Sequence, residues 1–440
     1  MSSRYAYLIA AVAAVSGLLF GFDTAVINGA LIFLRQELGL STRETEVATS
    51  SLLVGCAAGA AFAGWLTDRL GRKRILIVSA LLFAASAVGA AVPRNLGEFV
   101  AARLLGGLGI GVASVLAPLY IAEISPRAIR GRLVSLNQMA IVTGILLAYF
   151  VNWLLSFVGP SSWRWMFASA AVPSVAFFVA LLFVPESPRF LVEKGREAEA
   201  LVVLERVSGG QQAQGELEEI RDTLAQEAGS LRELFERRLR KPLGIAIFLA
   251  VFQQITGINT VIYYGSVIFK EHVGGQSDSS AIGANVVIGS VNFLMTIVAL
   301  WTIDRLGRRP LMMLASGGMA VSLFLLGFLF RFQPPPAVMI LAVILLYVAS
   351  FGVGLGPGVW VVISELFPTR IRGRAMSIAT LCLWLACILV TATFLSLVEA
   401  IGSTGAFWVY AAMSVLNLLF IWRVMPETKG RSLEEIERSW

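Results

Sequence analysis

The chain has 440 residues, of which 57% are hydrophobic and only 14% are charged, and its mean hydropathy is +0.78. Because so little polar surface cannot cover a soluble protein of this length, the composition excludes the soluble classes and indicates a protein embedded in lipid. A net charge of +7 would suit nucleic-acid binding. The basic residues, however, lie in short connections between apolar runs, so we expect the lipid bilayer and no nucleic acid as a partner.

Continuously apolar runs long enough to cross a bilayer as helices, which takes about 20 residues, follow one another along the chain. In the first half they occupy about 6–33, 45–66, 74–92, 97–121, 133–157 and 165–184. In the second half they occupy about 242–269, 280–303, 310–330, 338–364, 374–397 and 405–425. Because polar and apolar residues do not alternate in them, they are not strands of a membrane barrel. The sequence predicts an all-α membrane protein with twelve transmembrane helices.

The connections between these runs differ in charge. Lys and Arg are concentrated in alternate connections, at 67–74, 123–132, 304–309 and 365–374, and are sparse in the others. Connections rich in Lys and Arg normally lie in the cytoplasm. We therefore expect a multi-pass protein of the cell (inner) membrane with both termini in the cytoplasm.

One long polar segment separates the two sets of six runs. It divides the chain into an N-terminal bundle at 1–184, a linker at 185–241, a C-terminal bundle at 242–425 and a tail at 426–440. Mixed charges and helix-favouring residues in the linker predict short amphipathic helices on the cytoplasmic face; a partly ordered linker is the alternative. In the tail, Ser432 is expected to cap a short helix.

Three motifs occur once in each half and in the same order. The sequence D-R-L-G-R at 68–72 returns at 304–308, E-x6-R-G-R at 123–132 returns at 365–374, and Pro-Glu at 185–186 returns at 426–427. Two copies with the same polarity predict parallel halves related by an axis along the membrane normal, one of the architectures of secondary transporters.

The charged residues of the first two motifs are expected at the cytoplasmic ends of the helices. We predict that they form a gate there, a latch that ties the halves together while the outer side is open. The alternative is that they only tether loops and fix topology. The predicted gate residues are Asp68, Arg72, Glu123, Arg130, Asp304, Arg308, Glu365 and Arg372.

Together with Q-Q-I-T-G-I-N at 253–259 and G-P-G-V-W at 356–360, these motifs closely resemble the sugar porter family of the major facilitator superfamily, most of all the bacterial xylose or glucose:proton symporters. The resemblance runs from Gly17 to Glu435. It implies the major facilitator fold and a proton-coupled monosaccharide symporter that works by alternating access, not an enzyme. A facilitative uniporter is the first alternative, and a membrane sugar sensor is the second.

Two ionisable residues, Asp23 and Arg103, lie well inside the apolar runs at similar predicted depth. A lone charge at such depth is costly, so we expect the two to pair. Burial favours the neutral form of the carboxyl and Arg103 favours its charged form. Uptake and release of a proton by Asp23 would then switch the pair, which predicts proton coupling. The resemblance implies the same role; a static structural ion pair is the alternative.

The other polar residues within the runs are mostly amides with aromatic neighbours, a set that suits a neutral polyol. A helix interrupted near Gly257 would aim several of them at one cavity. By resemblance, the sugar-contact positions are Phe20, Gln138, Gln253, Gln254, Asn259, Tyr263, Asn292, Gly356, Trp360 and Trp384. The sequence departs from the family at Leu383, Cys387 and Gly352, which leaves the identity of the sugar open. We expect a monomer with no cofactor and no metal site, because the three cysteines and the single histidine have no metal-ligand spacing.

Overall fold

The computed structural model describes residues 2–126, 129–225, 231–273, 277–367 and 369–429, and these residues form helices and no β-strand. The predicted tail helix capped by Ser432 lies outside the described residues. Eleven helical stretches among the described residues are long and apolar enough to cross a membrane. The last of them contains two predicted spans, which are separated at Gly402 by a φ of +73°. The structure thus confirms the predicted all-helical fold with its twelve spans.

The helices follow the predicted order. The first six spans are α1 (Ser2–Leu38), α2 (Thr42–Leu70), α3 (Arg72–Ala91), α4 (Leu96–Ile124), α5 (Arg130–Leu155) and the pair α6 (Ser162–Ser169) and α7 (Ala171–Phe183). The next four are α11 (Arg240–Ile255) with α12 (Ile258–Val267), α13 (Asp278–Leu306), α14 (Arg308–Leu329), and α15 (Ala337–Ser350) with α16 (Gly356–Glu365). The last two share α17 (Thr369–Arg423).

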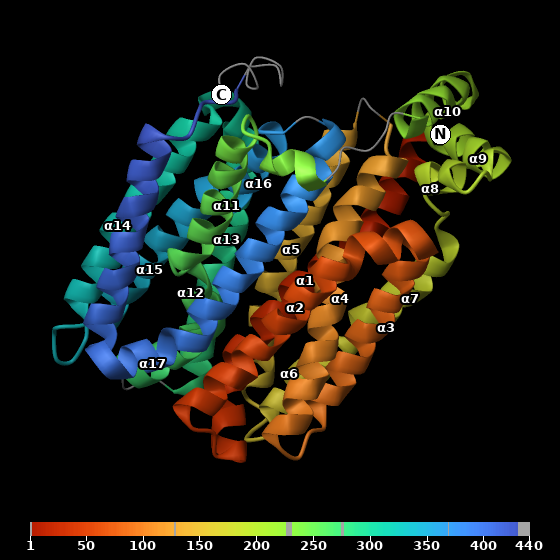
Figure 1. Ribbon diagram of the computed structural model, residues 1–440. Coiled ribbons are helices and arrows are strands. Elements are labelled where there is room, and N and C mark those ends of the chain that lie inside the picture. Colours follow the sequence, from red (N-terminus) through yellow and green to blue (C-terminus); the bar gives the residue numbers. More distant parts are fainter. Residues whose placement is uncertain (1, 127–128, 226–230, 274–276, 368, 430–440) are drawn as a thin grey trace.

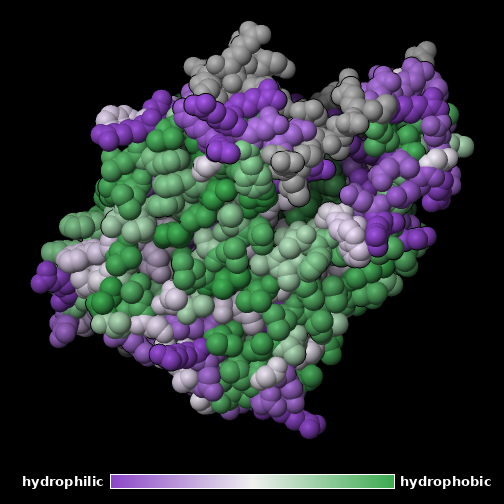
Figure 2. All heavy atoms as spheres, in the orientation of Figure 1, coloured by the Kyte–Doolittle hydropathy of each residue, from purple (hydrophilic) through white to green (hydrophobic). Residues whose placement is uncertain are grey.

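The linker forms the short helices that the sequence predicts, namely α8 (Pro188–Glu193), α9 (Glu197–Ser208) and α10 (Gly210–Ala225), followed by a 3₁₀ turn at Leu231–Phe235. These helices, the start of α1 and the end of α17 lie on the same side of the molecule, at the top of Figure 1. We call this side the terminal face and the other the opposite face. In Figure 2 hydrophobic residues cover the middle of the visible surface and hydrophilic residues gather at both faces, as expected for a protein that spans a bilayer.

Helix ends are set by local sequence signals. Ser41 begins α2 with a capping box, in which its side chain accepts from the Glu44 N–H while the Glu44 carboxylate accepts from the Ser41 N–H. Gly71 and Gly307 separate the helices of the two D-R-L-G-R motifs, with φ of +92° and +93°. Glycine adopts this backbone conformation without the strain that a side chain would impose, which explains its place in both copies.

Within the first half, glycines bring α2 and α4 unusually close. A Cβ added at Gly107 of α4 would lie 2.0 Å from the Leu52 carbonyl oxygen of α2, and one added at Gly59 of α2 would lie 2.4 Å from the Leu108 carbonyl oxygen of α4. Only a residue without a side chain fits such a contact, which is typical of helix packing in membranes.

The two halves meet chiefly where the following helices pack on one another. α2 packs on α17, α5 packs on α13, and α1 packs on α12. In Figure 1 the first half, in red to yellow, lies beside the second, in green to blue, and α2 and α17 run along the boundary between them. A central site can therefore draw residues from both halves.

Candidate functional site: a buried ion pair beside an amide and aromatic cluster

The predicted pair of Asp23 on α1 and Arg103 on α4 is present. The Arg103 Nη1 lies 3.3 Å from the Asp23 Oδ1, and both side chains are almost fully buried, at 1% and 4% exposure. A second guanidinium nitrogen, Nη2, donates to the Asp23 backbone carbonyl oxygen at 2.8 Å. Arg103 is thus tied to α1 by one bond that depends on the charge of the carboxylate and one that does not.

The surroundings of Arg103 give its charge little other compensation. Its guanidinium carbon lies 5.1 Å from the centre of the Phe167 ring, close enough for a cation–π interaction. Its Nε is buried and has no hydrogen-bond partner among the described residues. Because the buried guanidinium has so few compensating contacts, its free energy depends strongly on the charge of the Asp23 carboxylate.

The seventh span is interrupted as predicted. α11 ends at Ile255, Gly257 has a left-handed φ of +91°, and α12 begins at Ile258. Beside this break, Gln253 donates to the carbonyl oxygens of Leu355 and Gly356 at 2.9 and 3.0 Å. These carbonyls are available at the end of a π-helical turn, Phe351–Leu355, of a kind often found at functional sites.

From Gln253 a chain of polar contacts continues along the interrupted helix. Gln254 donates to the Gln253 side-chain oxygen at 3.2 Å, and Asn259 donates to the Gln254 side-chain oxygen. Asn259 also donates to the Cys387 Sγ at 2.9 Å on α17, and the buried Tyr263 hydroxyl lies beside the same thiol. Cys387, one of the departures from the family pattern, is thus part of the cluster.

An aromatic contact joins the two halves at this site. The rings of Phe20 on α1 and Trp384 on α17 have centroids 5.8 Å apart at an interplanar angle of 47°. The indole Nε1–H of Trp384 is buried and has no partner among the described residues. A buried donor of this kind ordinarily finds an acceptor, so it is suited to donate a hydrogen bond to a hydroxyl oxygen of a bound polyol.

Three of the predicted sugar-contact residues are not tied to this cluster. Gln138 on α5, Asn292 on α13 and Trp360 on α16 are half-buried, and between described residues no hydrogen bond or ring contact joins them to the others. Asn292 lies near Gly352: a Cβ added at Gly352 would lie 3.5 Å from the Asn292 side-chain oxygen. The structure thus brings together Phe20, Gln253, Gln254, Asn259, Tyr263, Gly356 and Trp384.

At the opposite face, hydrogen bonds join the two halves. Asn28 of α1 is fully buried, donates to the Val261 and Ile262 carbonyl oxygens at 3.2 and 2.7 Å, and accepts from the Ser266 N–H at 3.0 Å. Tyr149 of α5 donates to the Ile262 carbonyl oxygen at 3.0 Å. The structure is therefore closed on this side. Sequence reasoning missed Asn28, although a polar residue inside the first apolar run was a usable signal.

At the terminal face, the predicted gate residues pair within each half. Arg72 and Glu123 form a two-pronged contact, both distances being 2.9 Å, and both side chains are buried. In the second half Arg308 contacts Glu365 in the same way at 3.2 and 2.9 Å. Pairs with this geometry are stronger than exposed ones. The repeat in the sequence is thus a repeat of one structural unit.

The other gate residues contribute less. Arg130 and Arg372 donate to carbonyl oxygens at the end of the preceding helix, those of Ser125 and Phe367, both at 3.4 Å. Asp68 is exposed at the end of α2, and the side chain of Asp304 lies outside the described part of the chain. The ion pairs Arg72–Glu123 and Arg308–Glu365 each lie within one half. Because the halves are joined at the opposite face, the state in which a latch was expected is not the one observed, and that role stays a prediction.

The Pro-Glu motifs have a role that sequence reasoning missed. The Glu186 carboxylate accepts from the N–H groups of Arg72 and Lys73 at 2.9 and 3.0 Å, and so caps α3. Glu427 accepts in the same way from Arg308 and Arg309 at 3.1 and 3.0 Å at the start of α14. A carboxylate at a helix N-terminus is favourable for both hydrogen bonding and the helix dipole. The recurrence of Pro-Glu beside each D-R-L-G-R motif was the signal.

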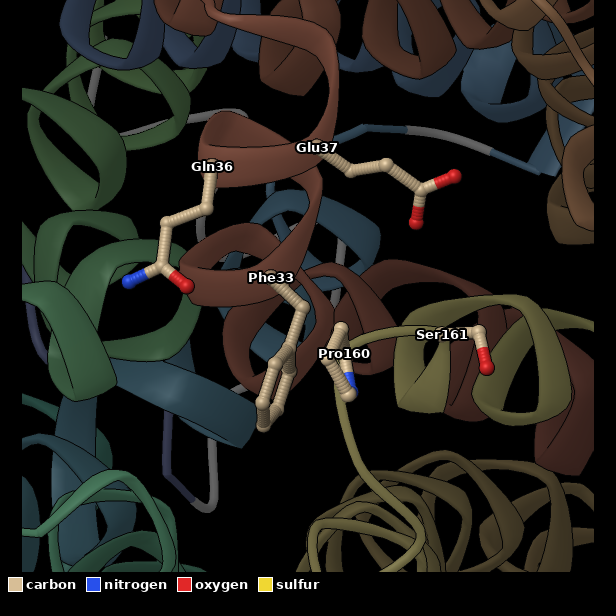
Figure 3. A pocket seen from close by; sticks show the side chains of 5 residues that line it. All are labelled: Phe33, Gln36, Glu37, Pro160 and Ser161. Carbon is tan, nitrogen blue, oxygen red and sulfur yellow. The ribbon is translucent and has the colours of Figure 1, made fainter.

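A surface cavity of about 520 Å³ lies elsewhere, at the opposite face (Figure 3), and its lining residues are Phe33, Gln36, Glu37, Pro160 and Ser161. None of these is a predicted sugar-contact residue. The Glu37 carboxylate is already engaged by the Trp163 Nε1–H at 2.6 Å and by Arg164 at 2.8 Å. This cavity is therefore separate from the central cluster.

Comparison with known proteins shows which family the chain belongs to. A family model described as "Sugar (and other) transporter" matches residues 9–440. The chain belongs to this family. It is accordingly a carrier and not an enzyme, and the major facilitator fold expected from the motifs is confirmed by its structural neighbours.

Two relatives match over nearly their full lengths. The arabinose-proton symporter of Bacillus subtilis is 41% identical over 100% of this chain and 96% of the relative. The D-xylose-proton symporter of Escherichia coli is 39% identical over the same shares of the two chains. A solved structure titled as the partially occluded inward open conformation of the E. coli xylose transporter XylE has a TM-score of 0.87 at 36% identity, and the match covers 98% of this chain and 100% of that one.

Proposed function

We propose that this protein is a proton-coupled monosaccharide symporter that works by alternating access. The observation that carries the proposal is the buried Asp23–Arg103 pair beside the cluster of amides and aromatic rings that both halves contribute. Phe20 precedes Asp23 by one turn of α1 and therefore lies on the same side of that helix. A sugar that contacts Phe20 and a proton on Asp23 would act on the same segment.

The chemistry of the pair suits a switch. When Asp23 is charged, the pair is neutral as a whole and holds α1 to α4. When Asp23 takes a proton, the ionic attraction to Nη1 is lost, while the bond from Nη2 to the carbonyl oxygen remains. Arg103 is then a buried cation without a counter-ion, which is costly. The protonated and charged states thus favour different helix arrangements, which is the requirement for coupling.

The cluster offers a neutral sugar both donors and acceptors. In this structure the amides of Gln253, Gln254 and Asn259 bond to one another and to backbone carbonyls. Sugar hydroxyls can exchange with those bonds, and the flat faces of Trp384 and Trp360 suit the C–H side of a sugar ring. Leu383 and Cys387, both buried, offer fewer polar contacts than the family pattern. Relatives named for arabinose and xylose support a pentose as cargo.

The proposal extends to topology and state. We place the terminal face in the cytoplasm of the cell (inner) membrane, because its connections are rich in Lys and Arg. The bundles at 1–184 and 242–425 would rock about the central site as a monomer. The contacts across the opposite face then make this the state that is closed to the outside.

The test is uptake by purified protein in liposomes with a panel of labelled pentoses and hexoses. An inward proton gradient should drive accumulation of at least one sugar above its external concentration, and a protonophore should abolish that accumulation. Uptake that only equilibrates, with the same rate with and without the gradient, would point to a uniporter. No uptake of any sugar would contradict the proposal as a whole.

A further inference from the structure

Glu46 is a second buried carboxylate, and the coupling mechanism does not use it. It lies on α2 near the opposite face with 4% of its surface exposed. The ion pairs found between described residues do not include it, in contrast to Asp23. A carboxylate buried within a membrane protein without a cation is costly, and such residues ordinarily have a function.

Both oxygens of Glu46 accept hydrogen bonds from one residue of the other half. The Ser396 backbone N–H of α17 donates to Oε1 at 2.7 Å, and the Ser396 hydroxyl donates to Oε2 at 2.6 Å. A backbone N–H inside a helix normally serves that helix, so the carboxylate reaches close to the backbone of α17. Hydrogen bonds to a charged acceptor are stronger than neutral ones.

Besides the uncharged contacts of Asn28 and Tyr149, two contacts with charged groups cross the seam on this side, and both are exposed. Thr42 of α2 donates to Glu399 of α17, and Arg35 of α1 contacts Glu271 at 2.6 Å with side-chain exposures of 21% and 45%. Exposed pairs of this kind contribute little. Glu46 and Ser396 therefore form the buried charged contact between α2 and α17.

We propose that the contact between Glu46 and Ser396 is an outer clamp, which stabilises the state closed to the outside and so sets the balance between the two states of the carrier. The inference rests on alternating access, because opening the outer side must separate α2 from α17 and break both hydrogen bonds. Glu46 would then be a positioning residue that acts on transport without touching sugar or the coupling proton. A contact made in one state and lost in the other biases the equilibrium between them.

The test measures from which side of the membrane the central site is accessible to a reagent in solution. Cys387 is buried beside Asn259 and serves as the reporter in a protein in which Cys56 and Cys382 are changed to Ser. A membrane-impermeant maleimide is added to right-side-out and to inside-out vesicles. Glu46→Gln should raise the labelling rate of Cys387 from the outside roughly tenfold or more and lower it from the inside, as expected for the loss of hydrogen bonds to a charged group.

Two further variants keep the test decisive. Ser396→Ala removes only the hydroxyl donor and should change the labelling rates of Cys387 in the same direction but less, roughly threefold. If Glu46→Gln does not fold, Ser396→Ala alone tests the clamp. Glu98→Gln changes an exposed carboxylate at the start of α4, within one half, and should label as the wild type does. Wild-type rates for both seam variants would overturn the clamp, as would faster labelling from both sides, which means general loosening. Labelling requires neither sugar nor a proton gradient, so this result is independent of the symport assay.

Discussion

The close approach of α2 and α4 makes a sharp prediction about two glycines of the same helix. At Gly59 an added Cβ would lie 2.4 Å from the Leu108 carbonyl oxygen, whereas at Gly64 it would meet nothing within 4 Å. An ordinary contact begins near 3.4 Å, so Gly59→Ala must separate the two helices by about 1 Å. Overpacking of this kind destabilises by roughly 1–3 kcal/mol.

Gly64→Ala is the matched control. The position is exposed and helical, so the substitution should stabilise the helix by about 0.5–1 kcal/mol. The assay is thermal unfolding of the purified variants in the same detergent. Gly59→Ala should unfold at a lower temperature than the wild type, and Gly64→Ala at the same or a higher one. Equal shifts in the two variants would refute the argument that backbone contact, and not helix propensity, fixes glycine at position 59.

Two other predictions concern the cluster and the helix caps. Trp384→Phe keeps the ring but removes the unpartnered Nε1–H, so the KM for sugar should rise about five- to tenfold; an unchanged KM would mean that the indole N–H does not face the cargo. Burial opposes the charge of Glu427, but the N–H groups of Lys429, Arg308 and Arg309 outweigh it and hold its pKa below the ordinary 4.5. A lowered pKa means a stabilising contribution that is present above pH 4.5 and is lost as the pH falls through the folded value. The gap in unfolding temperature between the wild type and Glu427→Gln should therefore be constant down to about pH 4.5 and shrink below it; a gap independent of pH would contradict the capping role.

The fold could be predicted from the sequence because lipid imposes long apolar runs on every span. The eleventh and twelfth spans show the limit of that rule. The structure makes them one element, α17, with only the positive φ of Gly402 between them, and hydropathy reports the two runs but not the geometry of their junction. The break at Gly257 could be foreseen because glycine there interrupts a run that also carries amides.

The site could be predicted in its members but only partly in its contacts. Pairing of Asp23 with Arg103 followed from the cost of a lone charge at depth. The partners of Glu123 and Glu365 did not follow from spacing, because the arginines that bind these carboxylates, Arg72 and Arg308, come from another helix. Glu46 was not predicted as a functional residue because it lies at the edge of the apolar run at 45–66. A carboxylate at that position is ordinarily interpreted as a residue of the exposed helix end.

The most direct measurement of the coupling mechanism compares Asp23→Asn with the wild type in two assays on the same liposomes. The amide keeps the shape of the side chain but can neither bind the proton nor carry the charge that pairs with Arg103. The variant should exchange labelled sugar across the membrane, yet fail to accumulate it under an inward proton gradient. Full accumulation by Asp23→Asn would show that the proton is carried elsewhere and would contradict the mechanism.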